Sequence, residues 1–355
     1  MAIEMVPYEP GHRAGLGRFY QRLAAGGTDP EMQFPEVSGP AWMPGSELWL
    51  AVEGSEVRGG YILRRQMFSF GSNAERVAHY RLPLSEGLVN RAYAQLALRL
   101  VRDALSREAR LYALGMGGWE KPLPQLLKRL NWRMAEVPFY FKAPHAYRFL
   151  RQIPALRSSR LRRVVCDAAA FSGAGWLALR LTGISRRTAG PAPIEFAPLF
   201  GGWADAVWEG SRDGYAMAAM RDAATLDQLY SSPDQRFLRI RAGGGWAVLL
   251  DTAMHSHKQF GDLRVGTIVD CLAPSGEAAA VVRAAARTLE ERGVDLIISN
   301  QLHHAWSDAL LEAGFHEGPT NFLVALAPAL AARVDGHADQ DIHINRGDGD
   351  GPIHL

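Results

Sequence analysis

The sequence predicts a duplicated α/β fold, with one arrangement of elements occurring twice along the 355 residues. Apolar residues alternate in some stretches, as in strands, and recur with helical spacing in others. The order of these stretches in the first half returns in the second half, offset by about 180 residues, and such internal repetition is typical of a duplicated unit. The length also fits about two domains of roughly 100–200 residues each.

The first half begins with a helix expected over 11–25, where Leu16, Phe19 and Leu23 lie on one face. Strands at 48–52 and 59–63 follow, joined by a polar, glycine-containing turn that is typical of a hairpin. The remaining elements of this half are listed in chain order: a strand at 77–84, an amphipathic helix at 91–106, a strand at 111–114, a helix at 123–130 and a strand at 137–142.

The second half repeats this order. Gly293 marks the end of its longest, alanine-rich helix, because glycine commonly follows the last helical turn. The expected elements are helices at 202–209 and 221–230, strands at 236–241, 246–251 and 265–272, a helix at 277–292, a strand at 295–299, a helix at 303–312 and a strand at 321–326.

Composition excludes several classes of protein. Hydrophobic residues make up 48% and charged residues 21% of the chain, which argues against global disorder. The formal net charge of +2 does not indicate a DNA-binding protein, which usually carries a strong basic excess. Two cysteines exclude a disulfide scaffold and a cysteine-rich zinc module. Because the first residues also lack the layout of a signal peptide, we expect a cytoplasmic location.

These patterns divide the chain into four expected segments: an N-terminal domain at 1–146, a basic helical connector at 147–190, a C-terminal domain at 191–332 and a Gly/Asp-rich tail at 333–355. Six arginines and no acidic residue fall within 148–163. A solvated connector is the favoured interpretation, and a peripheral contact with an anionic membrane is the alternative. Residues 164–183 approach a membrane span in length, but Asp167 and Arg180 favour a buried helix or connector.

The order of elements resembles the fold of the GCN5-related N-acetyltransferases (GNAT), present twice. In the first copy the resemblance rests on WLAVEGSEVRGGYIL (49–63), YRLPLSEGLVNRAYAQLALRLVRDAL (80–105), LYALGM and PLPQLLKRLNWRMAEVPFYF (122–141). In the second it rests on GWAVLLDT (245–252), VGTIVDCLAPSGEAAAVVRAAARTLEERG (265–293), VDLIISN and HHAWSDALLEAGFHEGPTNFLVAL (303–326). The resemblance implies two tandem GNAT-like domains, each with a mixed, mainly antiparallel central sheet flanked by helices.

The resemblance also implies a function. The chain would move an acyl group from acetyl-CoA or another acyl-CoA to an amine of a small-molecule or sugar-like acceptor, with no metal. In the family the fourth strand splays from the fifth, and the next turn presents backbone N–H groups to the donor's pyrophosphate. A helix N-terminus is suited to this task because it offers unpaired donors and the positive end of the helix dipole.

The family's pyrophosphate turn reads Arg/Gln-x-x-Gly-x-Gly/Ala, and both copies depart from it. The first copy offers Arg91, Ala92, Tyr93, Ala94 and Gln95, with Ala94 and then Leu96 at the glycine positions. The second copy has a shorter turn with Ser275 and Gly276 and no basic residue, which also fits an ordinary helix start capped by Ser275. A donor site is therefore expected in one of the copies, and the first copy is slightly favoured.

The acid and base of the reaction are open from the sequence. Many members of the family carry a tyrosine on the last helix that protonates the leaving thiolate, but the matching positions here are Leu127 and Leu310. Asp270 lies in an apolar strand, where burial would raise its pKa toward that of a useful base. The alternative is that Asp270 satisfies a backbone N–H or pairs with Arg264.

Other candidates come from both copies. His257 is a candidate substrate contact or general base, since the His-x-His pair at 255–257 has no third metal ligand at convincing spacing. In the first copy Glu86 is a candidate amine contact, base or turn residue. Tyr80 is a candidate proton donor, although an aromatic residue on a strand is more often core. His79, Ser85 and Tyr93 complete the candidates there.

Two alternatives to an acyl-CoA enzyme remain open at this point. The tandem arrangement has a distant similarity to the Fem-type transferases, which take their acyl group from aminoacyl-tRNA and need no CoA motif. The absent tyrosines also fit a non-catalytic scaffold of a cell-envelope or exopolysaccharide pathway. Binding of an acyl donor distinguishes these alternatives from the leading hypothesis.

Overall fold

The computed structural model describes residues 2–144, 193–231, 236–257 and 260–349. The chain forms two compact units, each built from separate stretches of sequence. The first unit comprises Met1–Phe68, Ala74–Ala135 and Leu323–Gly336, and the second comprises Ser69–Asn73, Glu136–Phe322 and His337–Leu355. The expected basic connector at 147–190, with its arginines, lies outside the described residues.

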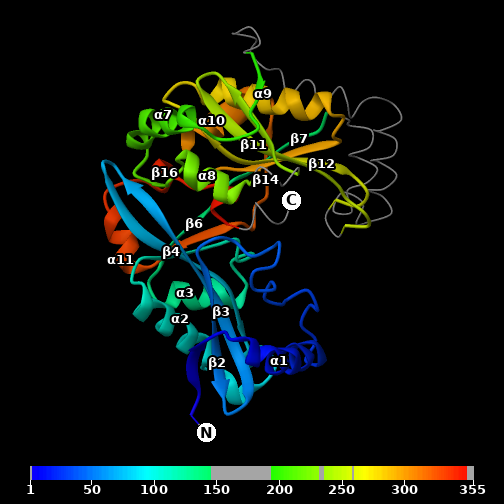
Figure 1. The fold of residues 1–355 in the computed structure, drawn as a ribbon, viewed down its shortest axis with the longest axis vertical. Helices are drawn as coiled ribbons and strands as arrows, with labels where there is room; N and C mark the ends of the chain where they lie inside the picture. The colour runs from blue at the N-terminus through cyan, green and yellow to red at the C-terminus, as the bar shows by residue number, and fades with distance from the viewer. Residues whose placement is uncertain (1, 145–192, 232–235, 258–259, 350–355) are drawn as a thin grey trace. The chain divides into compact units, whose positions relative to one another are not determined.

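The first unit is built on a mixed sheet with the strand order β1-β2-β3-β4-β5-β15-β6. Figure 1 labels β2, β3, β4 and β6 of this sheet. Its strands are β1 (Glu4–Pro7), β2 (Ser46–Glu53), β3 (Glu56–Phe70), β4 (Asn73–Ser85), β5 (Leu111–Leu114), β15 (Leu323–Leu326) and β6 (Arg133–Glu136). The pairs β1–β2, β2–β3 and β5–β15 are antiparallel, whereas β4 and β5 are parallel. The mainly antiparallel mixed sheet is the one expected from the sequence.

Helices cover both faces of this sheet. They are α1 (Arg13–Ala25), α2 (Leu96–Arg107), α3 (Pro122–Arg129) and the short α11 (Pro328–Ala331). One core lies under α2 and α3 and includes Tyr80 and Leu100. A second core lies under α1, where Phe19 and Leu23 pack with Ile62 of β3. Because successive strand residues point to opposite faces, neighbouring residues of β3 and β4 enter different cores.

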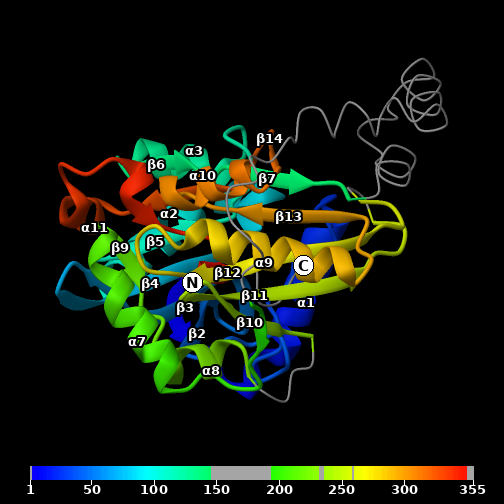
Figure 2. The same cartoon turned by 90° about the horizontal axis from the view of Figure 1, so that it is seen from above.

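The second unit has an equivalent sheet with the order β14-β7-β13-β12-β11-β10-β8. Its strands are β14 (His316–Gly318), β7 (Phe139–Lys142), β13 (Leu296–Asn300), β12 (Arg264–Leu272), β11 (Gly245–Ala253), β10 (Leu238–Ala242) and β8 (Glu195–Phe196). The helices are α7 (Gly202–Ser211), α8 (Ala223–Leu229), α9 (Ala278–Glu291) and α10 (His304–Glu312). α9 packs along the sheet with α10 on one face (Figure 2), and α7 and α8 share a core on the other.

The two sheets exchange one strand each. β7 was expected to close the first domain, yet it pairs with β13 and β14 in the second unit. β15 was expected to close the second domain, yet it pairs with β5 in the first unit. In both sheets the exchanged strand follows the short parallel strand in the order. The boundaries expected after residues 146 and 332 therefore differ from the two units at these strands.

The C-terminal segment is part of the second unit. A Gly/Asp-rich tail was expected from residue 333, and its described part contains β16 (Ile342–His343), which pairs in parallel with β9 (Met217–Ala219). A short 3-10 helix, η8 (Arg346–Asp348), follows. Asn345 and Asp348 are buried, so this segment contributes polar side chains to the interior of the unit.

Within the described part of the chain, no helix has both the length and the apolar character needed to cross a bilayer. The apolar stretch at 164–183 lies outside that part.

Candidate functional site

In the first unit β4 and β5 pair over two positions and then separate. The pairs are Ala78 with Leu111 and His79 with Tyr112. β4 continues to Ser85 and β5 to Leu114, and no further pair joins these two described strands. Leu82 has a φ of +47°, in the left-handed region that bulky residues rarely adopt, so β4 is kinked beyond the last pair. The result is a split in the sheet that begins at Tyr80.

The chain leaves β4 through a turn that ends at the N-terminus of α2. Asn90 caps the 3-10 helix η3 (Arg91–Tyr93) by accepting a hydrogen bond from the backbone N–H of Ala92 at 3.0 Å. Four of the five expected pyrophosphate-binding residues are exposed here: Arg91, Ala92, Ala94 and Gln95. The first turn of a helix leaves backbone N–H groups without intrahelical partners, which suits an anion. The structure therefore places these residues where a diphosphate can reach them.

The two departures from the family's glycines do not close this turn. Ala94 has φ −55° and ψ −30°, an ordinary right-handed conformation that does not require glycine. Leu96 is only 2% exposed and packs in the core under α2 and α3. Its side chain therefore points away from the exposed face of the turn.

Tyr93 and Glu86 anchor the turn rather than facing a ligand. The Tyr93 hydroxyl donates to Glu53 of β2 at 2.7 Å, and this hydrogen bond raises the pKa of Tyr93. Glu86 is 3% exposed, and its carboxylate accepts from Arg22 at 3.1 Å and from Arg58 at 3.2 Å. Two guanidinium groups thus donate to the Glu86 carboxylate, which was a candidate base from the sequence. This geometry favours the turn-residue alternative for Glu86.

Tyr80 and His79 lie on opposite faces of β4. Tyr80 packs in the core under α2, with its ring centroid 5.3 Å from that of Tyr61, and its hydroxyl has no hydrogen-bond partner among the described residues. Burial raises the pKa of Tyr80 well above 10, with smaller contributions from Tyr61 and Asp103. A phenol with a raised pKa gives up its proton less readily, which weakens the proposal of Tyr80 as proton donor.

The second unit contains the equivalent split between β12 and β13. Their parallel pairing ends at Ile268 with Ser299, whereas β12 continues to Leu272. A bulge opposite Val248 and Leu249 of β11 lies at the same level of β12. The second unit therefore has a split of the same kind as the one between β4 and β5.

The C-terminal segment fills this second split. The backbone N–H of Leu302 donates to the carbonyl of Ile344 at 3.0 Å, and Gln301 forms an isolated bridge with Asn345. His343 Nε2 donates to the carbonyl of Cys271 on β12 at 3.1 Å. Polar backbone groups that would face a donor in the split are thus bonded to the chain's own residues.

Asp270 belongs to this buried arrangement. Its carboxylate accepts from Arg221 at 2.9 Å, from Asn345 at 2.8 Å and from the Tyr230 hydroxyl at 2.8 Å. It also accepts from the backbone N–H of Cys271, as expected from the alternative in which Asp270 satisfies a backbone N–H. The expected pairing of Asp270 with Arg264 was wrong, because Arg264 pairs with Asp251 at 2.7 Å instead. With its oxygens taken by these donors, Asp270 holds the C-terminal segment in place.

The remaining candidates of the second copy are not brought together. His257 lies in the loop before β12, where its ring stacks on Phe260 with centroids 5.2 Å apart. Asp270 lies six residues along β12 from Arg264, about 20 Å at a rise of about 3.3 Å per residue, so His257 and Asp270 lie at opposite ends of the strand. Ser275 and Gly276 are exposed before α9. The expected cap at Ser275 was wrong, because the N-cap of α9 is Glu277.

Comparison with known proteins finds likeness in structure alone. No protein-family model matches the chain, and no curated protein matches its sequence. A GCN5-related N-acetyltransferase from Anabaena variabilis matches with a TM-score of 0.54 and 10% identity over 91% of this chain and 72% of that chain. A conserved protein of unknown function from Enterococcus faecalis, a probable N-acyltransferase, matches with a TM-score of 0.51 and 7% identity over 92% of this chain and 72% of that chain.

A third match is the N-myristoyltransferase of Saccharomyces cerevisiae, solved with bound myristoyl-CoA, with a TM-score of 0.50 and 7% identity over 92% of this chain and 78% of that chain. The chain has a tandem GNAT fold. At these identities the likeness concerns the fold, and the similarity to Fem-type transferases expected from the sequence is not among these findings.

The leucines at the family's tyrosine positions are core residues of this GNAT fold. Leu127 of α3 and Leu310 of α10 are buried in the two helix-covered cores. Neither position holds a proton donor. Among the described residues, no group of three or more His, Cys, Asp and Glu side chains is placed to hold a metal ion.

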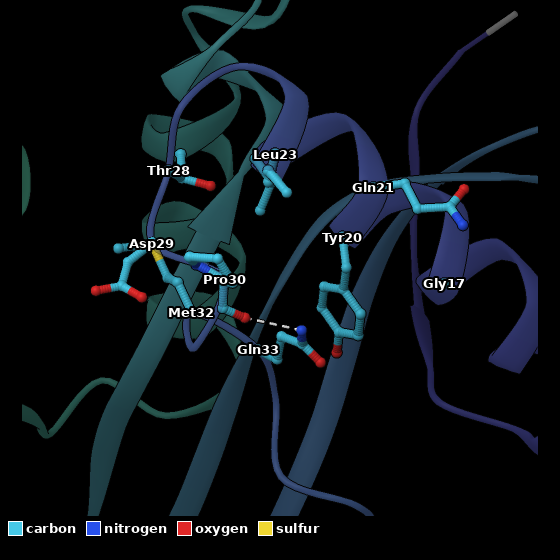
Figure 3. A pocket seen from close by; sticks show the side chains of 10 residues that line it. Gly17, Tyr20, Gln21, Leu23, Thr28, Asp29, Pro30, Met32 and Gln33 are labelled. Atoms are coloured by element: carbon cyan, nitrogen blue, oxygen red, sulfur yellow. Dashed lines mark hydrogen bonds between the residues drawn. The ribbon is translucent and has the colours of Figure 1, made fainter.

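A separate hollow lies beside α1 in the first unit (Figure 3). It has a volume of about 310 Å³ and lies between α1 and the loop at 28–33. The Tyr20 hydroxyl accepts from the backbone N–H of Phe34 at 3.1 Å, and Gln33 donates to the carbonyl of Pro30 at 2.8 Å. Burial raises the pKa of Tyr20 to about 12. None of the lining residues carries an unpartnered buried polar atom, so the hollow does not specify a ligand.

Sequence reasoning missed the residues that surround Asp270. Arg221, Asn345 and Asp348 are buried polar residues of the second unit, and Arg221 donates to Asp348 at 2.9 Å. One signal was available: Asn345 and Asp348 stand three residues apart and form a reciprocal capping box around η8. That spacing predicts an ordered turn where composition indicated a tail.

Proposed function

We propose that this protein is an N-acyltransferase that moves an acyl group from an acyl-CoA to an amine, and that the donor binds in the first unit. The observation that carries the proposal is the split between β4 and β5, followed by an exposed turn into α2. The second split is occupied by the C-terminal segment. We therefore expect one acyl-CoA per chain.

In this proposal the donor's diphosphate lies against the backbone N–H groups of the turn and the Arg91 guanidinium, which suits phosphate by charge and shape. The thioester reaches the split beyond His79, where the backbone of β4 is free of β5. Solved proteins of similar fold support this assignment, since one is a GCN5-related N-acetyltransferase and another holds myristoyl-CoA.

The acyl group is acetyl or longer, and the acceptor is a small-molecule amine or an amino sugar. With only two cysteines in the chain, we place the protein in the reducing cytoplasm.

Calorimetric titration of the full chain with acetyl-CoA, and with a longer acyl-CoA in parallel, tests the proposal. We expect saturable micromolar binding with a stoichiometry of one. Ala94→Asp places a negative charge at the exposed turn of the first unit, and repulsion should weaken binding by about tenfold or more. Ser275→Asp makes the matched change at the exposed turn of the second unit and should leave the dissociation constant unchanged.

The reversed pattern, with binding weakened by Ser275→Asp and not by Ala94→Asp, would move the donor to the second unit. A stoichiometry of two would contradict the occupied split. Absence of binding to every acyl-CoA would refute the proposed function.

A further inference from the structure

We infer that His79 is the residue that accepts the proton from the attacking amine. The inference rests on the proposed function and adds the identity of the base. Neither the pyrophosphate turn nor the leucines at the family's tyrosine positions provide a base. Four observations support it, concerning the position of His79, the face on which it lies, its ring nitrogens and the charges around it.

His79 is the last residue of β4 that pairs with β5, opposite Tyr112. The next residue begins the split. A thioester carbonyl held by the free backbone beyond this pair would therefore lie beside the His79 position. The ring of His79 stacks on that of Tyr112 with centroids 4.6 Å apart and an interplanar angle of 8°, which fixes its orientation.

The face matters because an amine needs an approach to the carbonyl carbon. The face carrying Tyr80 is closed by α2, with Leu96 and Leu100 fully packed against the sheet. His79 lies on the opposite face, since successive strand residues alternate. In this proposal the acceptor amine approaches from that opposite face, on which the base that serves it also lies.

Both ring nitrogens of His79 lack a hydrogen-bond partner among the described residues, although the side chain is 1% exposed. Leaving a buried polar atom unbonded is unfavourable, and native proteins rarely do so. Tyr112 shows the contrast, because its hydroxyl is bonded to the Gln66 side chain and lies 3.4 Å from Arg64 Nη2. An imidazole at the split that has no permanent hydrogen-bond partner is suited to a transient partner, here the attacking amine.

The charged neighbours of His79 are Arg64 on β3 and Arg81 on β4, with the Tyr112 phenol on β5. Burial, followed by the positive charges of Arg64 and Arg81, holds the pKa of His79 well below the ordinary histidine value. The ring is therefore neutral at pH 7 and has a lone pair to offer. A neutral imidazole is the form that a proton acceptor requires.

The step balances without any further reactant. The amine nitrogen bonds to the thioester carbonyl carbon, and its proton passes to a ring nitrogen of His79. The C–S bond then breaks, and its electron pair leaves on sulfur. The imidazolium returns the proton to the thiolate, so CoA departs as a thiol and His79 is neutral again.

The test uses the full chain, acetyl-CoA and hydroxylamine, a small amine that needs no dedicated pocket, with release of the CoA thiol as the readout. Donor affinity is measured separately by calorimetry. In His79→Gln we expect thiol release to fall about 100-fold or more while the acetyl-CoA dissociation constant stays within twofold. Imidazole in solution should restore part of the rate in His79→Ala.

The outcomes separate this inference from the function on which it rests. If the wild-type chain binds no acyl-CoA, the proposed function fails. If it binds and turns over, but His79→Gln is as fast and imidazole does nothing for His79→Ala, the inference alone is refuted. Binding without thiol release in the wild-type chain likewise contradicts a proton acceptor at this split. Where His79→Gln does not fold, imidazole rescue of His79→Ala decides.

Discussion

The guanidinium of Arg221 lies against the carboxylate of Asp270, with Nε and Oδ1 2.9 Å apart and the two side chains 2% and 1% exposed. The same guanidinium also reaches Asp348 of the C-terminal segment at 2.9 Å. One buried cation thus joins the central strand β12 to the last described residues of the chain. The split of the second unit is therefore filled by a segment of the same chain.

Replacing Arg221 should destabilise the protein strongly. Arg221→Met leaves two buried carboxylates without their cation, and breaking a buried pair in this way costs about 3–5 kcal/mol. Denaturant unfolding at neutral pH measures the loss. A change below about 1 kcal/mol would show that the carboxylates do not depend on Arg221.

Asp270→Asn should affect stability and not chemistry. The amide removes one charge but keeps an oxygen that can accept from Arg221 and Asn345 at the Oδ1 position. Its NH2 group replaces the oxygen that accepts from the Tyr230 hydroxyl. We expect acetyl-CoA binding and turnover to stay within twofold of the wild-type values in the folded variant. A loss of turnover of about 100-fold with donor binding intact would restore Asp270 as the base.

Loosening the C-terminal segment should expose the amide of Leu302. This N–H donates to Ile344, and Asn345 and Asp348 hold that segment down. In the double variant Asn345→Ala, Asp348→Ala, hydrogen exchange at Leu302 should speed up by about tenfold or more, whereas exchange in the core strand β5 should not change. Equal exchange at Leu302 in both proteins would show that the two side chains do not hold the segment.

Leu96 should matter for the core and not for the donor. Leu96→Ala removes a buried side chain from the packing between α2 and the sheet, which typically costs about 2–5 kcal/mol. The acetyl-CoA dissociation constant of the folded variant should stay within twofold. A marked gain in affinity, measured by calorimetry, would mean that Leu96 does obstruct the turn.

The stability of the second unit should fall with acid through His303. Burial, with a smaller contribution from His304, lowers the pKa of His303 to about 4. Its unfolded pKa is about 6.5, so the unfolded chain takes up the proton first and stability is lost as the pH falls from about 6.5 to about 4. The loss attributable to this group is about 3 kcal/mol at most.

The control for that prediction is His303→Asn, which keeps a side chain able to cap α10 but does not titrate. Unfolding free energies at pH 7.5 and pH 5 should differ less in the variant than in the wild-type chain. Identical differences in the two proteins would exclude His303 as a source of acid sensitivity.

Local patterns predicted most elements of the fold but could not predict which strands pair. The strand at 111–114 has the bounds expected from the sequence, and the helix expected at 303–312 begins one residue later. The sequence pattern predicts both β7 and β15 as short strands, but such a pattern does not indicate which sheet a strand joins. Their exchange therefore emerged only from the structure.

The buried polar cluster of the second unit could not be predicted from the sequence for a similar reason. Asp270 was recognised as a carboxylate in an apolar strand, but its partner Arg221 lies 49 residues away in the chain, and Asp348 lies 127 residues from Arg221. Such pairs form only in the folded chain, so no periodic pattern in the sequence indicates them. The exposed turn at 91–95 was easier to recognise, because its position after a strand and before a helix is a local feature.

The most direct test of the account compares hydrogen exchange in the full chain with and without saturating acetyl-CoA. A donor held by the first unit should slow exchange of the backbone amides between Tyr80 and Gln95 and leave those between Val269 and Ala278 unchanged. Slower exchange between Val269 and Ala278, with no change between Tyr80 and Gln95, would contradict the account and place the donor in the second unit.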